Sequence, residues 1–130
     1  MNISTNKPPN WEQLEKKFNV KWDDGVIVTY GDTAYCKSGG MSPDLRIHEQ
    51  THMIQQATMG VEIWWERYFA DKKFRLDQEL EAYRNQTQYI KRFVSNRKKR
   101  ANMMEHIWES MARMYDGMVS YETAKELLPL

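Results

Sequence analysis

The segment His48-Glu49-Gln50-Thr51-His52 has the HExxH pattern. In an α-helix, residues four positions apart project from the same face, so the imidazoles of His48 and His52 can bind one metal ion through neutral nitrogens. Glu49 lies one position further round the helix, where its carboxylate can reach a water molecule at the metal instead of the metal itself. The pattern therefore predicts a zinc ion held by two histidines, with Glu49 as general base. The alternative is two hydrogen-bonded histidines beside an unrelated glutamate.

A catalytic zinc site has three protein ligands and one open position for water, so a third ligand must lie elsewhere in the chain. In the metzincin pattern, a glycine and a third histidine follow the motif at set positions. This sequence has Gln55 and Thr58 at those positions, which excludes that branch. His106, the one remaining histidine, is an alternative ligand that would need an unusual fold.

Two glutamates further along the chain offer a better third ligand. A predicted helix at residues 75–94 has an apolar stripe that includes Leu76 and Tyr83. Glu79 lies three residues after Leu76 and four before Tyr83, on the stripe, whereas Glu81 is turned roughly 200° from Glu79 toward solvent. An ionised side chain on a core-facing stripe is costly unless it is paired or bound to metal, so we predict that Glu79 is the third ligand.

These motifs resemble those of a known class of zinc peptidases. HExxH followed by a glutamate on the next long helix resembles the gluzincins, and Glu79-x-x-Ala82 resembles the ExxA(D/N) form of their third-ligand helix. This sequence departs from that form at Tyr83, where the family pattern has Asp or Asn. Residues 48–56 are similar to the HExxHxxQQ run of small bacterial and phage-borne peptidases. The resemblance covers about residues 42–86 and implies a minimal zincin-like domain that uses Zn²⁺ to hydrolyse a peptide or protein substrate.

The resemblance also implies roles for residues outside the motif. A strand edge beside the motif helix usually binds extended substrate in such enzymes, and residues 33–36 are predicted to provide it. Zinc would lower the pKa of its water to ~7 while Glu49 moves the proton to the leaving amine. A further donor should stabilise the oxyanion, and a purely structural role is the alternative for each candidate. The candidates are Tyr35, Tyr68, Tyr83 and His106.

The segments before the motif predict a short helix and a hairpin. Trp11, Leu14 and Phe18 are at helical spacing after Asn10, a possible N-cap. Residues 26–30 and 33–36 are rich in β-branched and aromatic side chains and flank Gly31-Asp32, which predicts a β-hairpin.

Helices are predicted for the rest of the chain. Ser42-Pro43-Asp44 is a strong helix start and Gly60 a suitable end, so the motif helix should span residues 43–59. The aromatic residues that follow Val61 are expected to be mostly core, before the helix at residues 75–94. A short helix is expected at residues 123–128. Another helical pattern comprises Met104, Ile107, Met111, Met114 and Met118.

The composition fits one mostly helical α+β domain over residues 1–130, a minimal zincin-like fold with a short hairpin, three or more helices and a flexible start at residues 1–10. The net charge of +1 gives no overall field that would attract nucleic acid or membrane. Cys36 is the only cysteine, which excludes an intrachain disulfide and suits a buried thiol in a reducing compartment. The start lacks signal-peptide features and no apolar run could span a bilayer, so a cytoplasmic protein is expected.

Two other interpretations remain open. The first is that a basic cluster of four residues contacts phosphates or an acidic partner. Such a cluster is more commonly a solvated helix end, and no nucleic-acid-binding signature accompanies this one. The cluster is Arg97, Lys98, Lys99 and Arg100. The second is a non-catalytic zinc-binding structural or adaptor protein, for which a phage or mobile-element setting is one alternative. Glu49 favours the enzyme, because a structural zinc site needs no base.

Overall fold

Three short strands form a mixed sheet in the N-terminal part of the computed structural model, which describes residues 1–114 and 119–130. Strands β2 (Ile27–Tyr30) and β3 (Thr33–Cys36) form the predicted antiparallel hairpin. Gly31 in the turn has a φ of 65°, a conformation that glycine adopts without steric cost. Strand β1 (Asn2–Ser4) pairs in parallel with the other side of β3, so the order is β1-β3-β2.

Strand β1 corrects two predictions. The segment 1–10 is not flexible throughout, because Asn2–Ser4 pair with β3. A three-residue polar strand carries no alternating pattern, and its pairing depends on a partner about thirty residues away. The prediction that Thr33–Cys36 offer a free edge to substrate is wrong as well, since β1 and β2 occupy both edges of β3. The edge next to the motif helix belongs to β2, which packs against that helix.

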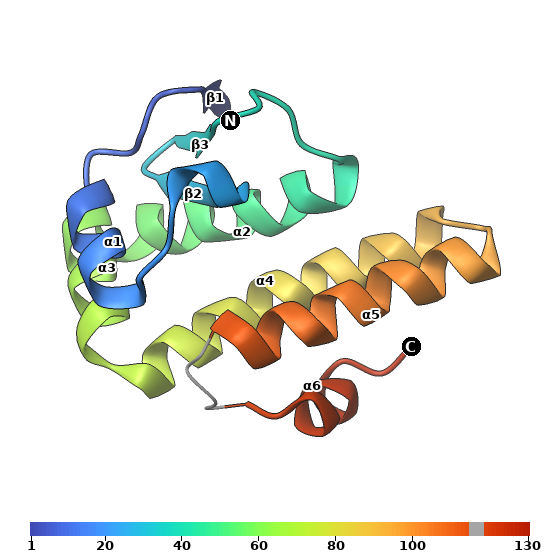
Figure 1. The fold of residues 1–130 in the computed structure, drawn as a ribbon. Helices are drawn as coiled ribbons and strands as arrows, with labels where there is room; N and C mark the ends of the chain where they lie inside the picture. The colour runs from blue at the N-terminus through green and yellow to red at the C-terminus, as the bar shows by residue number, and fades with distance from the viewer. Residues whose placement is uncertain (115–118) are drawn as a thin grey trace.

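Helices make up most of the remaining chain, as predicted, and give a mostly helical α+β fold (Figure 1). In the described residues they are α1 (Trp11–Phe18), the 3₁₀ turn η1 (Trp22–Asp24), α2 (Pro43–Met59), α3 (Val61–Ala70), α4 (Lys72–Phe93), α5 (Arg97–Met114) and α6 (Tyr121–Leu127). The motif helix has the predicted bounds. Helix α4 begins a turn earlier than predicted because the Asp71 carboxylate accepts a hydrogen bond from the Phe74 amide and caps the helix. The predicted helical position Met118 lies outside the described residues.

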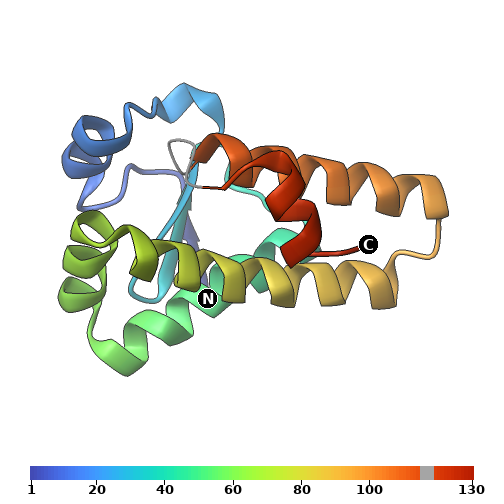
Figure 2. The same ribbon diagram turned by 90° about the horizontal axis from the view of Figure 1, so that it is seen from below.

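Helix α2 lies between the sheet and the hairpin formed by α4 and α5 (Figures 1 and 2). The side-chain amide of Gln56, which is fully buried, ties β2 to this helix. Its Oε1 accepts from the Gly31 amide at 2.7 Å, and its Nε2 donates to the Thr29 carbonyl at 2.8 Å. This clamp sets the position of β2 relative to the HExxH residues.

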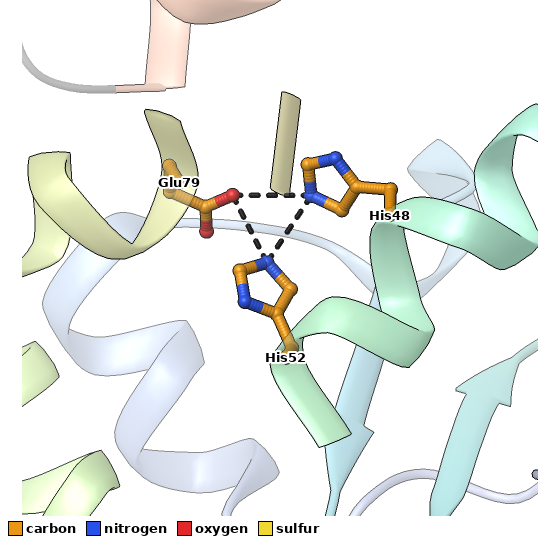
Figure 3. A group of neighbouring side chains, drawn as sticks. All are labelled: His48, His52 and Glu79. Atoms are coloured by element: carbon orange, nitrogen blue, oxygen red, sulfur yellow. Dashed lines mark hydrogen bonds and ion pairs between the residues drawn. The ribbon is translucent and has the colours of Figure 1, made fainter. Parts of the chain in front are cut away.

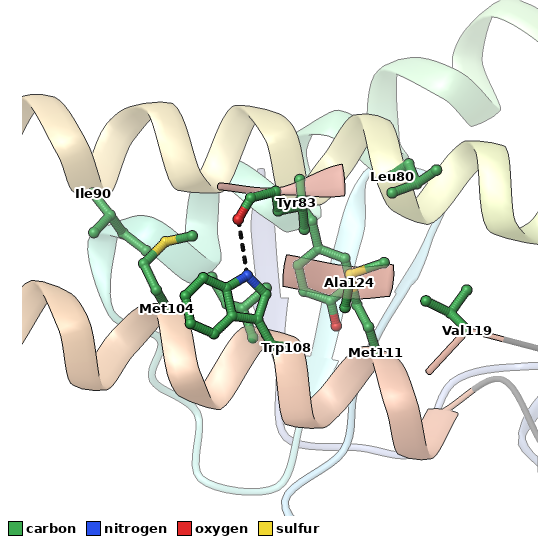
Figure 4. Packing of buried hydrophobic residues seen from close by; sticks show 10 residues of the cluster. Leu80, Tyr83, Ile90, Met104, Trp108, Met111, Val119 and Ala124 are labelled. Atoms are coloured by element: carbon green, nitrogen blue, oxygen red, sulfur yellow. Dashed lines mark hydrogen bonds between the residues drawn. The ribbon is translucent and has the colours of Figure 1, made fainter. Parts of the chain in front are cut away.

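Two apolar clusters support this arrangement. The first packs α1, β2, α3 and the start of α4 around Trp64, which confirms that the aromatic residues after Val61 are mostly core. The second joins α4, α5 and α6, where the Trp108 indole donates to the Leu128 carbonyl at 2.8 Å (Figure 4). Cys36 is buried, as predicted. Among the described residues, no helix combines the length and apolarity needed to cross a bilayer.

Candidate metal centre

Helices α2 and α4 bring the two motif histidines and one glutamate together (Figure 3). The Nε2 atoms of His48 and His52 are 3.1 Å apart, and Oε1 of Glu79 is 3.1 Å from each of them. All three side chains are buried. Each of the three atoms can act as a metal ligand, and either a proton or a bound cation between them would offset the repulsion of their lone pairs. The cluster could hold a metal ion.

A hydrogen bond at the second ring nitrogen of His48 sets the tautomer of this imidazole. His48 Nδ1 lies 3.0 Å from Oε1 of Gln86, and the Gln86 amide donates to the Asp44 carboxylate at 2.9 Å. Because a carboxylate accepts only, the amide nitrogen faces Asp44 and its oxygen faces the ring. His48 therefore donates from Nδ1, which leaves the Nε2 lone pair directed at the cluster.

His52 is held in the same way by another glutamine. Its Nδ1 lies 2.9 Å from Oε1 of Gln55, while the Gln55 amide donates to the Gln78 carbonyl and to the Glu81 carboxylate, both at 3.0 Å. Glu81 is thus an exposed residue that orients Gln55, in agreement with the predicted orientation of its side chain toward solvent. Both imidazoles point Nε2 at the cluster, so each can bind a metal through this nitrogen once the nitrogen carries no proton.

The other carboxylate oxygen of Glu79 is bound to Tyr68. The Tyr68 hydroxyl donates to Oε2 at 2.6 Å, so Oε1 is the oxygen that faces the histidines. Burial, followed by the Glu79 charge, raises the pKa of Tyr68 well above its usual value and keeps this donor protonated. Tyr68 was one of the predicted candidates for the oxyanion donor, but its hydroxyl already donates to Glu79.

Glu49 lies beside the cluster. Its Oε1 accepts from the Thr29 hydroxyl at 3.0 Å, and its Oε2 lies 3.9 Å from Nε2 of His48. Burial raises the pKa of Glu49, although the nearby histidines His48 and His52 work in the opposite direction. A carboxylate with a raised pKa is a stronger base than an exposed one, and the Thr29 bond holds it toward the cluster.

A cavity of about 590 Å³ leads to the cluster, and we call it the site cavity. Its walls include the cluster and Glu49, together with residues of α1, β2 and α5. Tyr83 and His106 also line it, whereas Tyr35 on the central strand does not. The Tyr83 and His48 rings pack with their centroids 4.4 Å apart, so the residue that stands where the resembling motif has Asp or Asn contacts a cluster histidine. The site cavity therefore borders the cluster and Glu49 together.

Sequence reasoning missed the residues that orient the cluster. Thr29, Gln86 and Asp44 belong to three different elements and act through contacts with residues distant in the chain. Gln86 had a usable signal, since it lies seven residues after Glu79 and hence on nearly the same face of α4. Thr29 is polar in an otherwise apolar and aromatic strand, which marks it only weakly.

Removing the hydroxyl that holds Glu79 is expected to weaken metal binding. In Tyr68→Phe the ring still packs but Oε2 of Glu79 loses its donor, so zinc affinity should fall about 10- to 100-fold. Competition with a fluorescent zinc chelator measures the change. Tyr35→Phe, outside the site cavity, is the matched control, and equal affinities for the two variants would contradict this role of Tyr68.

Metal binding is also expected to depend on pH through His52. Burial works to lower the pKa of His52, but Glu79 and then Glu49 and Gln55 outweigh it and raise that pKa from 6.5 to about 9. Below that pH the metal must displace a proton, so apparent zinc affinity should rise roughly tenfold per pH unit from pH 7 toward 9. Burial works to raise the pKa of Glu79, but the neighbouring His52 and His48 hold that pKa well below its usual value. Glu79 is therefore already ionised at these pH values and releases no proton when a metal binds. Chelator competition at several pH values tests the slope, and a flat profile would contradict it.

No protein-family model, curated protein or solved structure matches the chain. The class of protein therefore rests on the fold and the site alone. It is a mostly helical α+β protein in which a buried His/His/Glu cluster, with the histidines at HExxH spacing, could hold a metal ion.

Proposed function

We propose that this protein is a zinc-dependent hydrolase of peptide bonds, with His48, His52 and Glu79 as metal ligands and Glu49 as the general base. One observation carries the proposal. The oriented His/His/Glu cluster lines a cavity together with a buried carboxylate that is not part of the cluster. This is the division of roles that the HExxH motif has in gluzincins, which the chain resembles.

The donor set fits zinc. Two imidazoles and one carboxylate form a common catalytic zinc ligand set, and a site with three protein ligands keeps a position for water. Ligands at ~2.0–2.1 Å from a tetrahedral ion lie roughly 3.3 Å apart, close to the 3.1 Å separations of the three atoms. When bound, zinc supplies a Lewis acid that acidifies water and polarises a carbonyl group.

Glu49 performs the proton transfers in this proposal. Its carboxylate takes a proton from water as the water attacks the peptide carbonyl, and then gives that proton to the leaving amine. The Thr29 hydroxyl bonds one oxygen of Glu49, which leaves the other oxygen for this proton. Burial favours the reaction because it raises the pKa of Glu49 and brings its basicity closer to what neutral pH requires.

The substrate and its developing oxyanion are assigned to groups that border the site cavity. In this proposal an extended peptide lies along residues 26–28 at the outer edge of β2, which line the cavity near Glu49; the Thr29 carbonyl at the same edge is already bonded by Gln56. Two donors remain for the oxyanion, Tyr83 and His106. Among the described residues, the Tyr83 hydroxyl contacts the Met114 sulfur at 3.6 Å, and sulfur is a weak acceptor that a substrate oxygen would replace.

The rival proposal is a zinc-binding protein without catalytic activity. A structural zinc site is closed by four protein ligands. Among residues 1–114 and 119–130, the cluster that could bind a metal has three members. A buried carboxylate such as Glu49 is also costly to keep without a task. Both observations favour the enzyme.

Hydrolysis of an unstructured protein tests the proposal. Zinc-loaded protein should cleave casein, lose that activity when a chelator removes the metal, and regain it when one equivalent of zinc is restored. Cleavage that persists after complete metal removal would contradict the mechanism. Stoichiometric zinc without cleavage of casein or of a broad peptide mixture would favour the rival.

A further inference from the structure

A second cavity, of about 710 Å³, lies between the first turn of α2 and the hairpin of α4 and α5. We call it the hairpin groove. Most of its wall is apolar, and no step of the proposed reaction uses it. The apolar residues include Pro43, Leu45, Tyr89, Phe93, Met103 and Ile107.

The hairpin groove adjoins the site cavity. Leu45, Gln86 and His106 line both of them. Gln86 is also the residue that orients His48, so the shared wall reaches the metal cluster itself. The groove therefore begins beside the site cavity, where the segment of a substrate that flanks the cleaved bond would lie.

The groove has an aromatic surface that is exposed to water. The Phe93 side chain is 60% exposed, and its ring packs against the Tyr89 ring with centroids 4.7 Å apart. Contact with a large apolar side chain would remove this surface from water, which favours binding. The groove is thus suited to an aromatic or large aliphatic residue.

Two lysines give one end of the groove a positive charge. Lys98 and Lys99 line it, both are exposed, and neither forms an ion pair with any residue of 1–114 or 119–130. The one acidic wall residue, Asp44, is buried and accepts from Gln86. Arg100, the last residue of the predicted basic cluster, is half-buried and donates to the Val94 carbonyl, so it faces α4. Two lysines beside an apolar wall fit an acidic peptide better than a nucleic acid backbone, which needs many cations.

We propose that the hairpin groove binds the part of the substrate next to the cleaved bond, with a large apolar side chain against Phe93 and an acidic side chain at Lys98 and Lys99. The inference rests on the proposed hydrolase and names its substrate class, peptides with an apolar residue flanked by acidic ones. Specificity arises because the apolar contact and the charge pairing must be met in one short segment.

Binding to an inactive variant tests the groove separately from catalysis. Zinc-loaded Glu49→Gln protein is titrated with two fluorescent decapeptide mixtures of Gly, Ala and Ser that contain one Phe flanked on both sides by Glu or by Lys. The Glu mixture should bind about tenfold more tightly. Lys98→Glu with Lys99→Glu should abolish or reverse this preference, and Phe93→Ala should weaken binding of the Glu mixture about tenfold.

Matched controls carry the same changes outside both cavities. Lys16→Glu with Lys17→Glu reverses two adjacent exposed charges on α1, and Ile63→Ala shortens an exposed apolar side chain on α3. Both should keep the preference for the Glu mixture. Equal affinity for the two mixtures, or a preference that survives the Lys98 and Lys99 changes, would overturn the groove assignment. So would tighter, lysine-dependent binding of a single-stranded dT20 oligonucleotide.

Cleavage by the unsubstituted protein separates the two proposals. Preferential cleavage of the Glu mixture next to Phe supports both. Preferential binding without cleavage of either mixture would support the ligand class of the groove and contradict the hydrolase. Cleavage of both mixtures at equal rates would contradict the groove and leave the hydrolase standing.

Discussion

Glu49→Gln is expected to leave zinc bound and to lower kcat/KM by about 10²- to 10⁴-fold, the range that general acid–base catalysis contributes. Glutamine has nearly the same shape, and its side-chain oxygen can still accept from the Thr29 hydroxyl, so the fold and the cluster should persist. An amide cannot take the proton from water at neutral pH, and the first proton transfer is therefore lost. Zinc content and peptide hydrolysis are measured on the same preparation.

The matched control for that variant is Glu62→Gln, the same chemical change at an exposed residue of α3 that lines neither cavity. It should retain full activity and full zinc content. A Glu49→Gln protein that hydrolyses peptides at the rate of the unsubstituted one would remove Glu49 as the base. Loss of zinc from this variant would instead make Glu49 a ligand.

Glu79→Gln and His48→Ala are expected to lower zinc affinity at least about a hundredfold each. A four-ligand structural zinc site has an apparent binding free energy of ~10–16 kcal/mol, or roughly 3 kcal/mol per ligand, and each variant removes or neutralises one ligand. Glu81→Gln is a sharp comparison because it makes the same change two residues away on α4. It should retain most of the affinity, since glutamine can still accept from Gln55. Chelator competition measures all three.

Circular dichroism of the metal-free proteins distinguishes ligand loss from unfolding. If Glu79→Gln and Glu81→Gln weaken zinc binding equally while both remain helical, Glu79 has no special place in the site. Equal and unchanged affinity in both variants would mean that zinc binds elsewhere on the protein.

The sequence predicted the motif helix and the orientation of Glu79 because both depend on local periodicity. Pro43 and Gly60 mark the ends of α2 by their backbone preferences, and the 3.6-residue repeat alone places Glu79 inside and Glu81 outside. The hairpin was predictable for the same reason, from strand-forming residues on either side of Gly31-Asp32.

The sequence did not predict what depends on contacts between distant segments. Strand β1 forms because β3 has an open side, and its own residues carry no strand pattern. The bonds from Thr29 to Glu49 and from Gln86 to Asp44 join residues 20 and 42 positions apart. The edge of β2 borders the site because β2 packs against α2, whereas β3 lies between β1 and β2.

An X-ray absorption spectrum of the zinc-loaded protein would test the ligand set most directly. We expect one zinc per chain in a shell of nitrogen and oxygen ligands at ~2.0–2.1 Å, with the scattering of two imidazole rings. The histidine signal should fall by half in His48→Ala. A sulfur ligand at ~2.3 Å, which only Cys36 or a methionine could supply, or a spectrum without imidazole scattering would contradict a centre built from His48, His52 and Glu79.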